Sequence, residues 1–393
     1  MASILQQSNM ADITHWEIGQ LVYSFYAMGP AQTVVRRAVD TFYQKLLQRL
    51  RSGSAPVQPE RGRFGEPQLQ WVEPSFQGPN PERSWCGTYH LIWKSDALHQ
   101  GTGCLWAISP FKSFARWLEQ QVTSVLRETV SQGASVYIDD KPFFWTLAID
   151  SQPKVRWTSE ELHRHRGSVT ALVRARSEDW SIYHDRAMQQ ILDTNMAYTT
   201  EELQLMHYNT GLIYISKERF LKREGFDYVQ RAIVDTNALL RTMRVCLLLL
   251  RSELDRTLQT SINARVANRY RHASLRNMLV RAQSATDLLG QFNRQNFDAT
   301  RRVGHEQTVF FTLLNRYQIP TLVDSVNQQL GRLHDQIGEY HNARQSRQLR
   351  LVNVLVLIPA LYHAWKFYIE VVPTLAPFWQ TLMKNMPTWN LPW

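Results

Sequence analysis

Cysteine and histidine side chains in the first half of the chain could form a nucleophilic pair. In such a pair the imidazole removes the thiol proton, and the thiolate attacks a carbonyl carbon. The thiols are Cys86 and Cys104, and the imidazoles are His90 and His163. No signature of a thiol protease surrounds them, and core or loop cysteines are far more common than catalytic ones. The pattern favours structural cysteines, and a protease dyad stays open as an alternative.

Three other short patterns have residue types suited to chemistry but lack the spacing. His163 and His165 are two residues apart on a predicted helix, so they point to different faces and do not suit one metal ion. Asp139-Asp140 has the composition of a hairpin turn. Gly101-Thr102-Gly103 lacks the rest of a phosphate-binding loop, and HExxH and GxSxG are absent from the sequence. We therefore predict no catalytic, cofactor-binding or metal-binding residues, and a protein that is not an enzyme.

The elements that would position these residues follow an α+β order over residues 1–178. One predicted helix opens at Pro30 and repeats apolar residues every four positions, as at Ala38 and Phe42. A second predicted helix opens at Ser109-Pro110. The β-branched and aromatic runs predict strands over 20–27, 68–72, 88–93, 104–108, 135–138, 143–149 and 169–173. Two helices on one face of a mostly antiparallel sheet predict a mixed, ferredoxin-like domain or a duplication of that arrangement.

Residues 179–350 are predicted to be helical. Strand signals nearly vanish from about residue 179, and prolines and glycines are few over 226–350. A second helix, over about 320–350, is predicted to run antiparallel to the first. Apolar ladders at helical spacing define the inward faces at Leu247, Leu250, Leu254, Leu258, Ile262 and Val266, and at Leu322, Val326, Leu330, Leu333 and Ile337. These patterns predict a helical stalk or bundle, and we hypothesise that it also drives self-association.

The composition indicates a folded body in a reducing compartment. Hydrophobic residues make up 44% of the chain and charged residues 20%, so burial can offset chain entropy. The three cysteines are far apart and never in CxxC spacing, which argues against a disulfide framework and a cysteine zinc site. The N-terminal residues lack the basic and apolar regions of a secretory signal. We therefore expect the bulk of the chain to stay in the cytoplasm.

The net charge of +10 lies in one segment. Residues 217–350 hold 22 Lys and Arg against 12 Asp and Glu, and the rest of the chain is balanced. A basic segment next to a membrane is typical of proteins that attract anionic lipid or nucleic acid. A solvated helical surface with unpaired arginines has the same composition. Both interpretations stay open.

Residues 351–372, LVNVLVLIPALYHAWKFYIEVV, form the most apolar stretch. As a helix they have about the length needed to cross a hydrocarbon core of roughly 30 Å. Lys366 lies toward the far end, where its side chain can reach the interface. We predict a transmembrane segment and interfacial tail over 351–393; a re-entrant hairpin, an interfacial helix pair and a buried soluble helix are the alternatives. The predicted membrane-contacting residues are Arg344, Arg347, Arg350, Trp365, Lys366, Tyr368 and Trp379.

The basic residues before this segment favour a location in the cell inner membrane, with one or two passes. Arginines cluster just before the apolar stretch, and only Lys384 lies well after it. Because positive residues stay on the cytoplasmic side, the N-terminal body is expected in the cytoplasm.

The LVYSFYAMGP run followed by a helix, the stalk and the 351–383 end give the chain a layout that resembles two families. One is the caspase- and TPR-repeat-associated (CATRA-like) proteins of prokaryotic conflict systems. That resemblance implies an N-terminal α/β domain, a helical C-terminal domain, membrane segments and a caspase-like protease or other conflict-system protein as partner. The other is the CorA-type divalent-cation channels, whose Gly-Met-Asn signature is missing here.

These observations lead to an expected function, a membrane-anchored, non-enzymatic effector or scaffold. If the first resemblance holds, it acts in prokaryotic antiviral defence and couples a protein signal to the membrane. The partners are then membrane lipid, a protein of the same system and further copies of the chain. One alternative is a CorA-like oligomeric ion channel or transporter, and another is an arginine-rich nucleic-acid-binding protein. Specific nucleic-acid binding is not expected, because the arginines lack an aromatic stacking platform and a reading motif.

Overall fold

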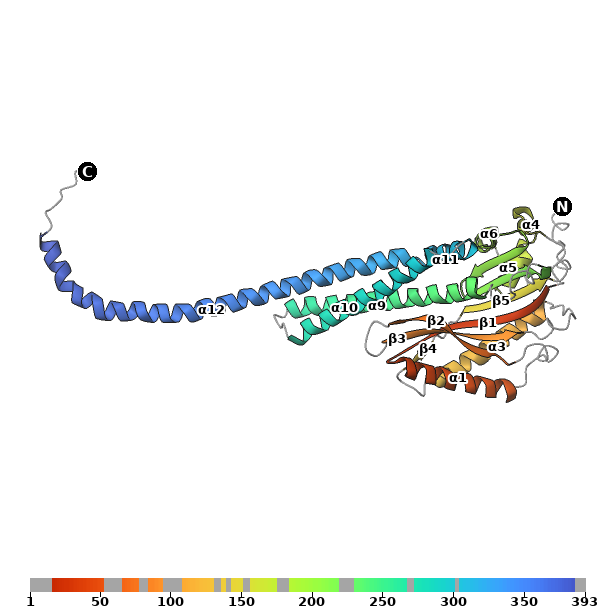
Figure 1. Ribbon diagram of the computed structural model, residues 1–393, viewed down its shortest axis with the longest axis horizontal. Helices are drawn as coiled ribbons and strands as arrows, with labels where there is room; N and C mark the ends of the chain where they lie inside the picture. The colour runs from red at the N-terminus through yellow and green to blue at the C-terminus, as the bar shows by residue number, and fades with distance from the viewer. Residues whose placement is uncertain are drawn as a thin grey trace.

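A sheet-based head and a long helical stalk make up the described part of the chain (Figure 1). The head holds the N-terminal strands, and the stalk extends far beyond it on one side, which agrees with the α+β class and the helical C-terminal part predicted from the sequence. The computed structural model describes residues 16–52, 66–77, 84–94, 108–130, 136–138, 143–150, 156–174, 184–218, 230–266, 272–300 and 304–385.

The described sheet has seven strands, in the order β2-β3-β1-β5-β7-β6 with the short β4 paired to β1. Strands β5 and β7 are parallel, and the other neighbouring pairs are antiparallel. The bounds are β1 Trp16–Gly29, β2 Gln68–Gln77, β3 Trp85–Lys94, β4 Tyr137–Ile138, β5 Phe143–Asp150, β6 Glu202–His207 and β7 Thr210–Ser216.

The first half of the head follows the ferredoxin-like order of elements. Helix α1 (Gln32–Ser52) connects β1 to β2, and helix α3 (Ile108–Val130) lies between β3 and β5. Strand β3 sits between β1 and β2 and is antiparallel to both, which is the split βαβ connection of that arrangement. Strands β7 and β6 then extend the sheet beyond β5.

Two sequence predictions about this part of the chain are wrong. The run Val169–Val173 is not a strand but lies in helix α5 (Arg166–Arg174), because Val169 and Val173 are four residues apart and bury on one helical face. The stretch after residue 179 is not purely helical, because the hairpin β6–β7 completes the sheet. Its two-residue turn uses Tyr208, with φ of 38°, and Asn209 instead of the Asn-Gly that marks such turns most strongly.

Helices α1 and α3 cover one face of the sheet through an apolar layer. Phe25 of β1 packs edge-on against Phe42 of α1, with ring centroids 5.5 Å apart, and stacks on Tyr89 of β3. The small helices α4 (Ser159–Arg164), α5 and α6 (Asp185–Leu192) lie near the β7–β6 end of the sheet, where α5 and α6 residues such as Val169 and Ile191 join a second apolar cluster. This face is therefore closed by elements of the head itself.

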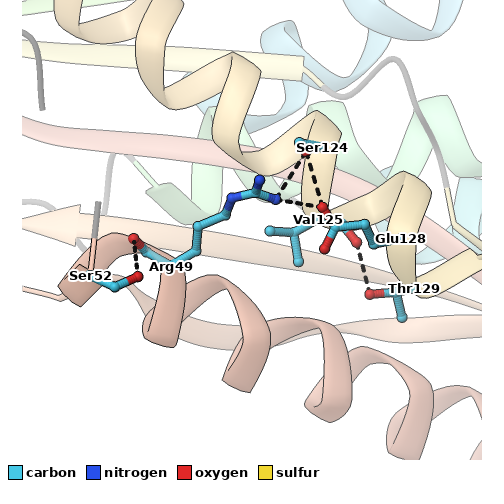
Figure 2. Close-up of polar contacts among 6 residues, drawn as sticks. All are labelled: Arg49, Ser52, Ser124, Val125, Glu128 and Thr129. Atoms are coloured by element: carbon cyan, nitrogen blue, oxygen red, sulfur yellow. Dashed lines mark hydrogen bonds and ion pairs between the residues drawn. The ribbon is translucent and has the colours of Figure 1, made fainter. Parts of the chain in front are cut away.

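A polar link joins α1 to α3 above this layer (Figure 2). Arg49 donates to the Ser124 hydroxyl at 2.9 Å and to the Glu128 carboxylate at 2.6 Å. Both charged side chains are more than a third exposed, so solvent screens the pair and it adds little stability. The apolar residues beneath it account for most of the packing.

The stalk helices begin on the opposite face of the sheet. A π-helical turn, η6 (Gln230–Asp235), leads directly into α9 (Thr236–Val266), and α10 (His272–Thr300), α11 (His305–Arg316) and α12 (Ile319–Asn385) follow. Sheet residues such as Trp145 and Ile213 share one buried cluster with residues of these helices. The helices predicted over 226–350 are confirmed, and α12 continues past the predicted end at residue 350. The predicted antiparallel direction of the second helix is wrong. Helix α12 runs parallel to α9, because Tyr317 contacts Asn237 near the start of both helices and Gln329 contacts Asp255 further along each.

We expect Gly211→Ala to destabilise the head strongly. Gly211 lies beside Trp145 on the neighbouring strand, and a Cβ at this position would overlap the indole ring. Relieving the overlap costs about 1–3 kcal/mol. The matched control is Gly338→Ala on α12, where nothing lies within 4 Å of the added Cβ, so helix propensity adds about 1 kcal/mol of stability. Urea titrations compare the two variants, and equal midpoints would contradict this packing.

Candidate membrane-contacting helix

The shaft of the stalk is an apolar bundle of α9, α10 and α12. On α9 the predicted inward residues Leu247, Leu250, Leu254 and Leu258 are all buried, and the most exposed of them is Leu258, at 7%. On α12 the predicted inward residues Leu322, Val326, Leu330, Leu333 and Ile337 are also buried. The apolar spacing read from the sequence thus gives the correct inward faces for these residues.

Polar contacts fix the register of the three shaft helices. Arg281 of α10 pairs with Glu253 of α9 and donates to the Thr257 hydroxyl at 2.8 Å. Gln329 of α12 donates to Asp255 of α9 at 2.5 Å. Because these partners come from different helices, a shift of one helix along another would break them.

A second set of contacts lies where the stalk meets the head. The Tyr317 hydroxyl, between α11 and α12, donates to Asn237 of α9 at 2.6 Å. Arg316 donates to the Met206 carbonyl of β6 at 3.1 Å. Burial raises the pKa of Tyr317 to about 12, so its hydroxyl keeps its proton at neutral pH. The edge of the sheet and the first turns of the stalk are therefore held together.

Beyond the bundle, α12 continues alone (Figure 1). The helix has 67 residues and a length of about 100 Å at 1.5 Å per residue. Every residue from 348 to 366 is exposed. Within this stretch lie large apolar side chains that are each more than half exposed: Leu349, Leu351, Val352, Val354, Leu355, Val356, Leu357, Ile358, Leu361, Tyr362 and Trp365.

These apolar side chains surround the helix. The five consecutive residues from Val354 to Ile358 are 55–65% exposed, and each is rotated by about 100° from the one before. Together they cover the full circumference, so this segment has no polar face. A helix that is apolar all round is typical of a protein core or a membrane interior, and this one is in neither within the single chain.

No helix within the described residues combines the length and the apolar character needed to span a membrane. The transmembrane segment predicted over 351–372 is therefore not supported.

The predicted membrane-contacting residues all fall on α12. Arg350, Trp365 and Lys366 are exposed at the two ends of the apolar stretch. The side chains of the other four, Arg344, Arg347, Tyr368 and Trp379, lie outside the described residues. The structure thus gives a solvent-facing position to three of the seven.

The structure separates the residues considered for chemistry. Cys86 and His90 both lie on β3, four residues apart, so their backbones are about 13 Å apart and they cannot form a dyad. Cys86 and Cys246 are buried thiols that form no disulfide. His163 is exposed and contacts Arg166 at 2.7 Å. Cys104, Asp139-Asp140 and Gly101-Thr102-Gly103 lie outside the described residues.

His165 is buried beside Glu161 at 3.4 Å. Among the described residues, no group of three or more His, Cys, Asp or Glu side chains could hold a metal ion. The site with the clearest physical character is therefore the apolar part of α12.

Comparison with known proteins gave no match, whether to a family model, to a curated protein or to a solved structure.

Proposed function

We propose that this protein is a membrane-bound, non-enzymatic effector or scaffold. The head receives a protein signal, and the stalk connects it to the bilayer through the apolar part of α12, residues 349–366. One observation supports this most directly: the exposed apolar side chains of Val354–Ile358 surround the helix. In water such a surface is costly, at about 25 cal/mol for each Å² of apolar area.

Lipid suits this surface better than a single protein partner. A second helix packs along one stripe and leaves the rest in water, whereas acyl chains contact all sides. Eight residues of 351–366 are Leu, Ile or Val, and at about −0.45 kcal/mol each they favour insertion by roughly 3.5 kcal/mol. Burial of the apolar segment in the bilayer therefore removes the cost.

The ends of the segment carry the side chains expected at a lipid interface. Arg350 and Lys366 are separated by 16 residues, or about 24 Å along a helix. Both long side chains flank the apolar stretch and can extend from it to lipid headgroups. Trp365 and Tyr362 supply the aromatic groups that concentrate at that level.

Some of the basic charge has partners inside the molecule. Arg281 pairs with Glu253, and the Arg241 guanidinium lies over the Phe143 ring at 5.2 Å from its centroid. Arg281 joins two stalk helices, and Arg241 joins the stalk to the sheet. These contacts favour a structural role for part of the excess and weaken the case for nucleic acid as the main target.

Two parts of the expected function stay predictions. The place in prokaryotic defence and the caspase-like partner follow only from the resemblance in layout. An ion channel would need several copies, because one helix does not enclose a path for ions and polar groups inside a bilayer must be satisfied within the assembly. Ion flux across vesicles that carry the protein distinguishes the channel from the tether.

The proposal is tested by vesicle flotation of the full chain. We expect the protein to float with vesicles of phosphatidylcholine and to float more completely when phosphatidylserine is added. The added gain is about 1 kcal/mol for each basic residue at the headgroups, so Arg350 alone gives roughly a fivefold change. If the protein stays with the unbound fraction for both compositions, the membrane proposal is wrong.

A further inference from the structure

A polar pocket lies between the sheet and the start of the stalk. Its volume is about 660 Å³, and its polar lining comes from β2, β3 and the π-helical turn η6. These lining residues are Gln68, Gln70, Lys94, Gln230, Arg231 and Asp235. Pockets of this size hold small molecules, and π-helical turns occur often at functional sites.

Strand pairing sets the wall of the pocket. Gln70 of β2 lies opposite His90 of β3, and Gln68 lies opposite Ile92. Both pairs are on the face of the sheet that the stalk covers. From η6, the Gln230 amide donates to Gln70 at 2.6 Å, and the Asp235 carboxylate contacts Nε2 of His90 at 3.0 Å. Two side-chain contacts thus hold η6 against the sheet, at the sides of the pocket.

The sheet beside the pocket contains buried polar groups without partners. Gln20 lies opposite Lys94, is fully buried, and has no hydrogen bond to either side-chain atom among the residues described. Ser24, opposite His90, is buried and equally without a partner there, and so is Nδ1 of His90. Buried polar groups are almost always hydrogen-bonded, because leaving them unpaired is costly. Together with the polar lining of the pocket, these groups favour a ligand site here.

We propose that this pocket binds a small phosphate- or carboxylate-bearing metabolite. Lys94 and Arg231 bring positive charge to its lining, and the negative charge of Asp235 faces His90. The amides of Gln68 and Gln70 can donate to and accept from the polar groups next to the anion. The site is separate from the lipid-binding part of α12 and does not depend on it.

The position of the pocket connects ligand binding to the stalk. Residue 235 ends η6 and residue 236 begins α9, so the turn that lines the pocket is continuous with the first stalk helix. A ligand that contacts Arg231 therefore also stabilises the junction between the head and α9. Binding should raise the melting temperature of the full chain by mass action.

The test is calorimetric titration of the full chain with inorganic phosphate, adenosine 5′-monophosphate and citrate. We expect at least one probe to bind with a Kd of about 100 µM or tighter, and Lys94→Gln and Arg231→Gln each to weaken it about tenfold. A preference for the two phosphates or for citrate identifies the anion. The control is Arg37→Gln, in a second basic pocket on the outer side of α1, which should leave the Kd unchanged.

The variant Gln20→Leu tests whether the buried polar groups beside the pocket take part in ligand binding. If Gln20 only fills the core, leucine leaves the Kd unchanged; if the polar groups beside the pocket contribute to binding, leucine weakens it. Circular dichroism checks that each variant is folded. The proposal is overturned if no probe binds, or if the pocket variants bind as tightly as Arg37→Gln. Vesicle flotation of the same variants should not change, so failure here leaves the membrane proposal intact.

Discussion

Replacing Leu355, Leu357 and Ile358 together with aspartate is expected to release the protein from vesicles. An aliphatic side chain at the bilayer centre gains about 0.5 kcal/mol, whereas aspartate there costs about 3 kcal/mol. The three changes therefore cost roughly 10 kcal/mol, more than the segment gains in total. In flotation assays the variant should move from the lipid fraction to the unbound fraction.

The same substitution is expected to leave the melting temperature in water nearly unchanged. The three side chains are 55–65% exposed and support no packing within the chain. The matched control changes the same residues to valine, which keeps the apolar surface and should keep flotation. The interpretation is contradicted if the aspartate variant floats like the unchanged protein, or if it unfolds at a clearly lower temperature.

Leu254→Ala in the stalk is expected to produce the second large effect, on stability. The side chain is 1% exposed and belongs to the buried cluster that α9 shares with α10 and α12. Truncating a buried leucine costs about 2–5 kcal/mol through lost burial and the cavity that remains. The free energy of unfolding from urea titration measures this cost.

The control on the same helix is Leu248→Ala, whose side chain is 37% exposed. Changes at such surface positions stay within about 0.5 kcal/mol. Leu254 packs against helices of its own chain, so its effect should not depend on protein concentration. A cost that grows on dilution would instead support the hypothesis that the stalk drives self-association, which stays a prediction.

Periodic apolar patterns made most of the helices predictable. On α1, Val35, Val39 and Phe42 repeat at helical spacing and are fully buried, and the ladders of α9 and α12 gave the shaft of the stalk in the same way. The run of 169–173 has the composition of a strand, because valine favours strands in general, but the four-residue spacing of its two valines suits the helix that forms.

The hairpin β6–β7 and the polar pocket could not be predicted from local sequence patterns. Strands β6 and β7 are short, and β7 pairs in parallel with β5, more than 60 residues earlier, which no local pattern reveals. The pocket combines residues near positions 70, 92 and 230. The polar residues Gln20 and Ser24 alternate with apolar ones on β1, a pattern usually assigned to a solvent face. In the folded chain that face is covered by the stalk.

The apolar part of α12 shows what the fold adds to hydropathy. The sequence identifies the apolar stretch, but a buried soluble helix has a similar composition. Exposure separates the two cases, because Leu355 and Val356 are each 65% exposed while Leu333 on the same helix is fully buried. Nothing among the described residues covers the segment, which agrees with the proposed contact with lipid.

The most direct test places an environment-sensitive fluorophore at position 355. The full chain carries Leu355→Cys with Cys104→Ser, and the buried Cys86 and Cys246 should not react. On adding vesicles, we expect the emission to shift to the blue and to be quenched by lipids with spin labels on their acyl chains. The same fluorophore at Val280 of α10, a side chain 55% exposed on the shaft, should not respond. Emission at position 355 that stays water-like in the presence of lipid would contradict the account.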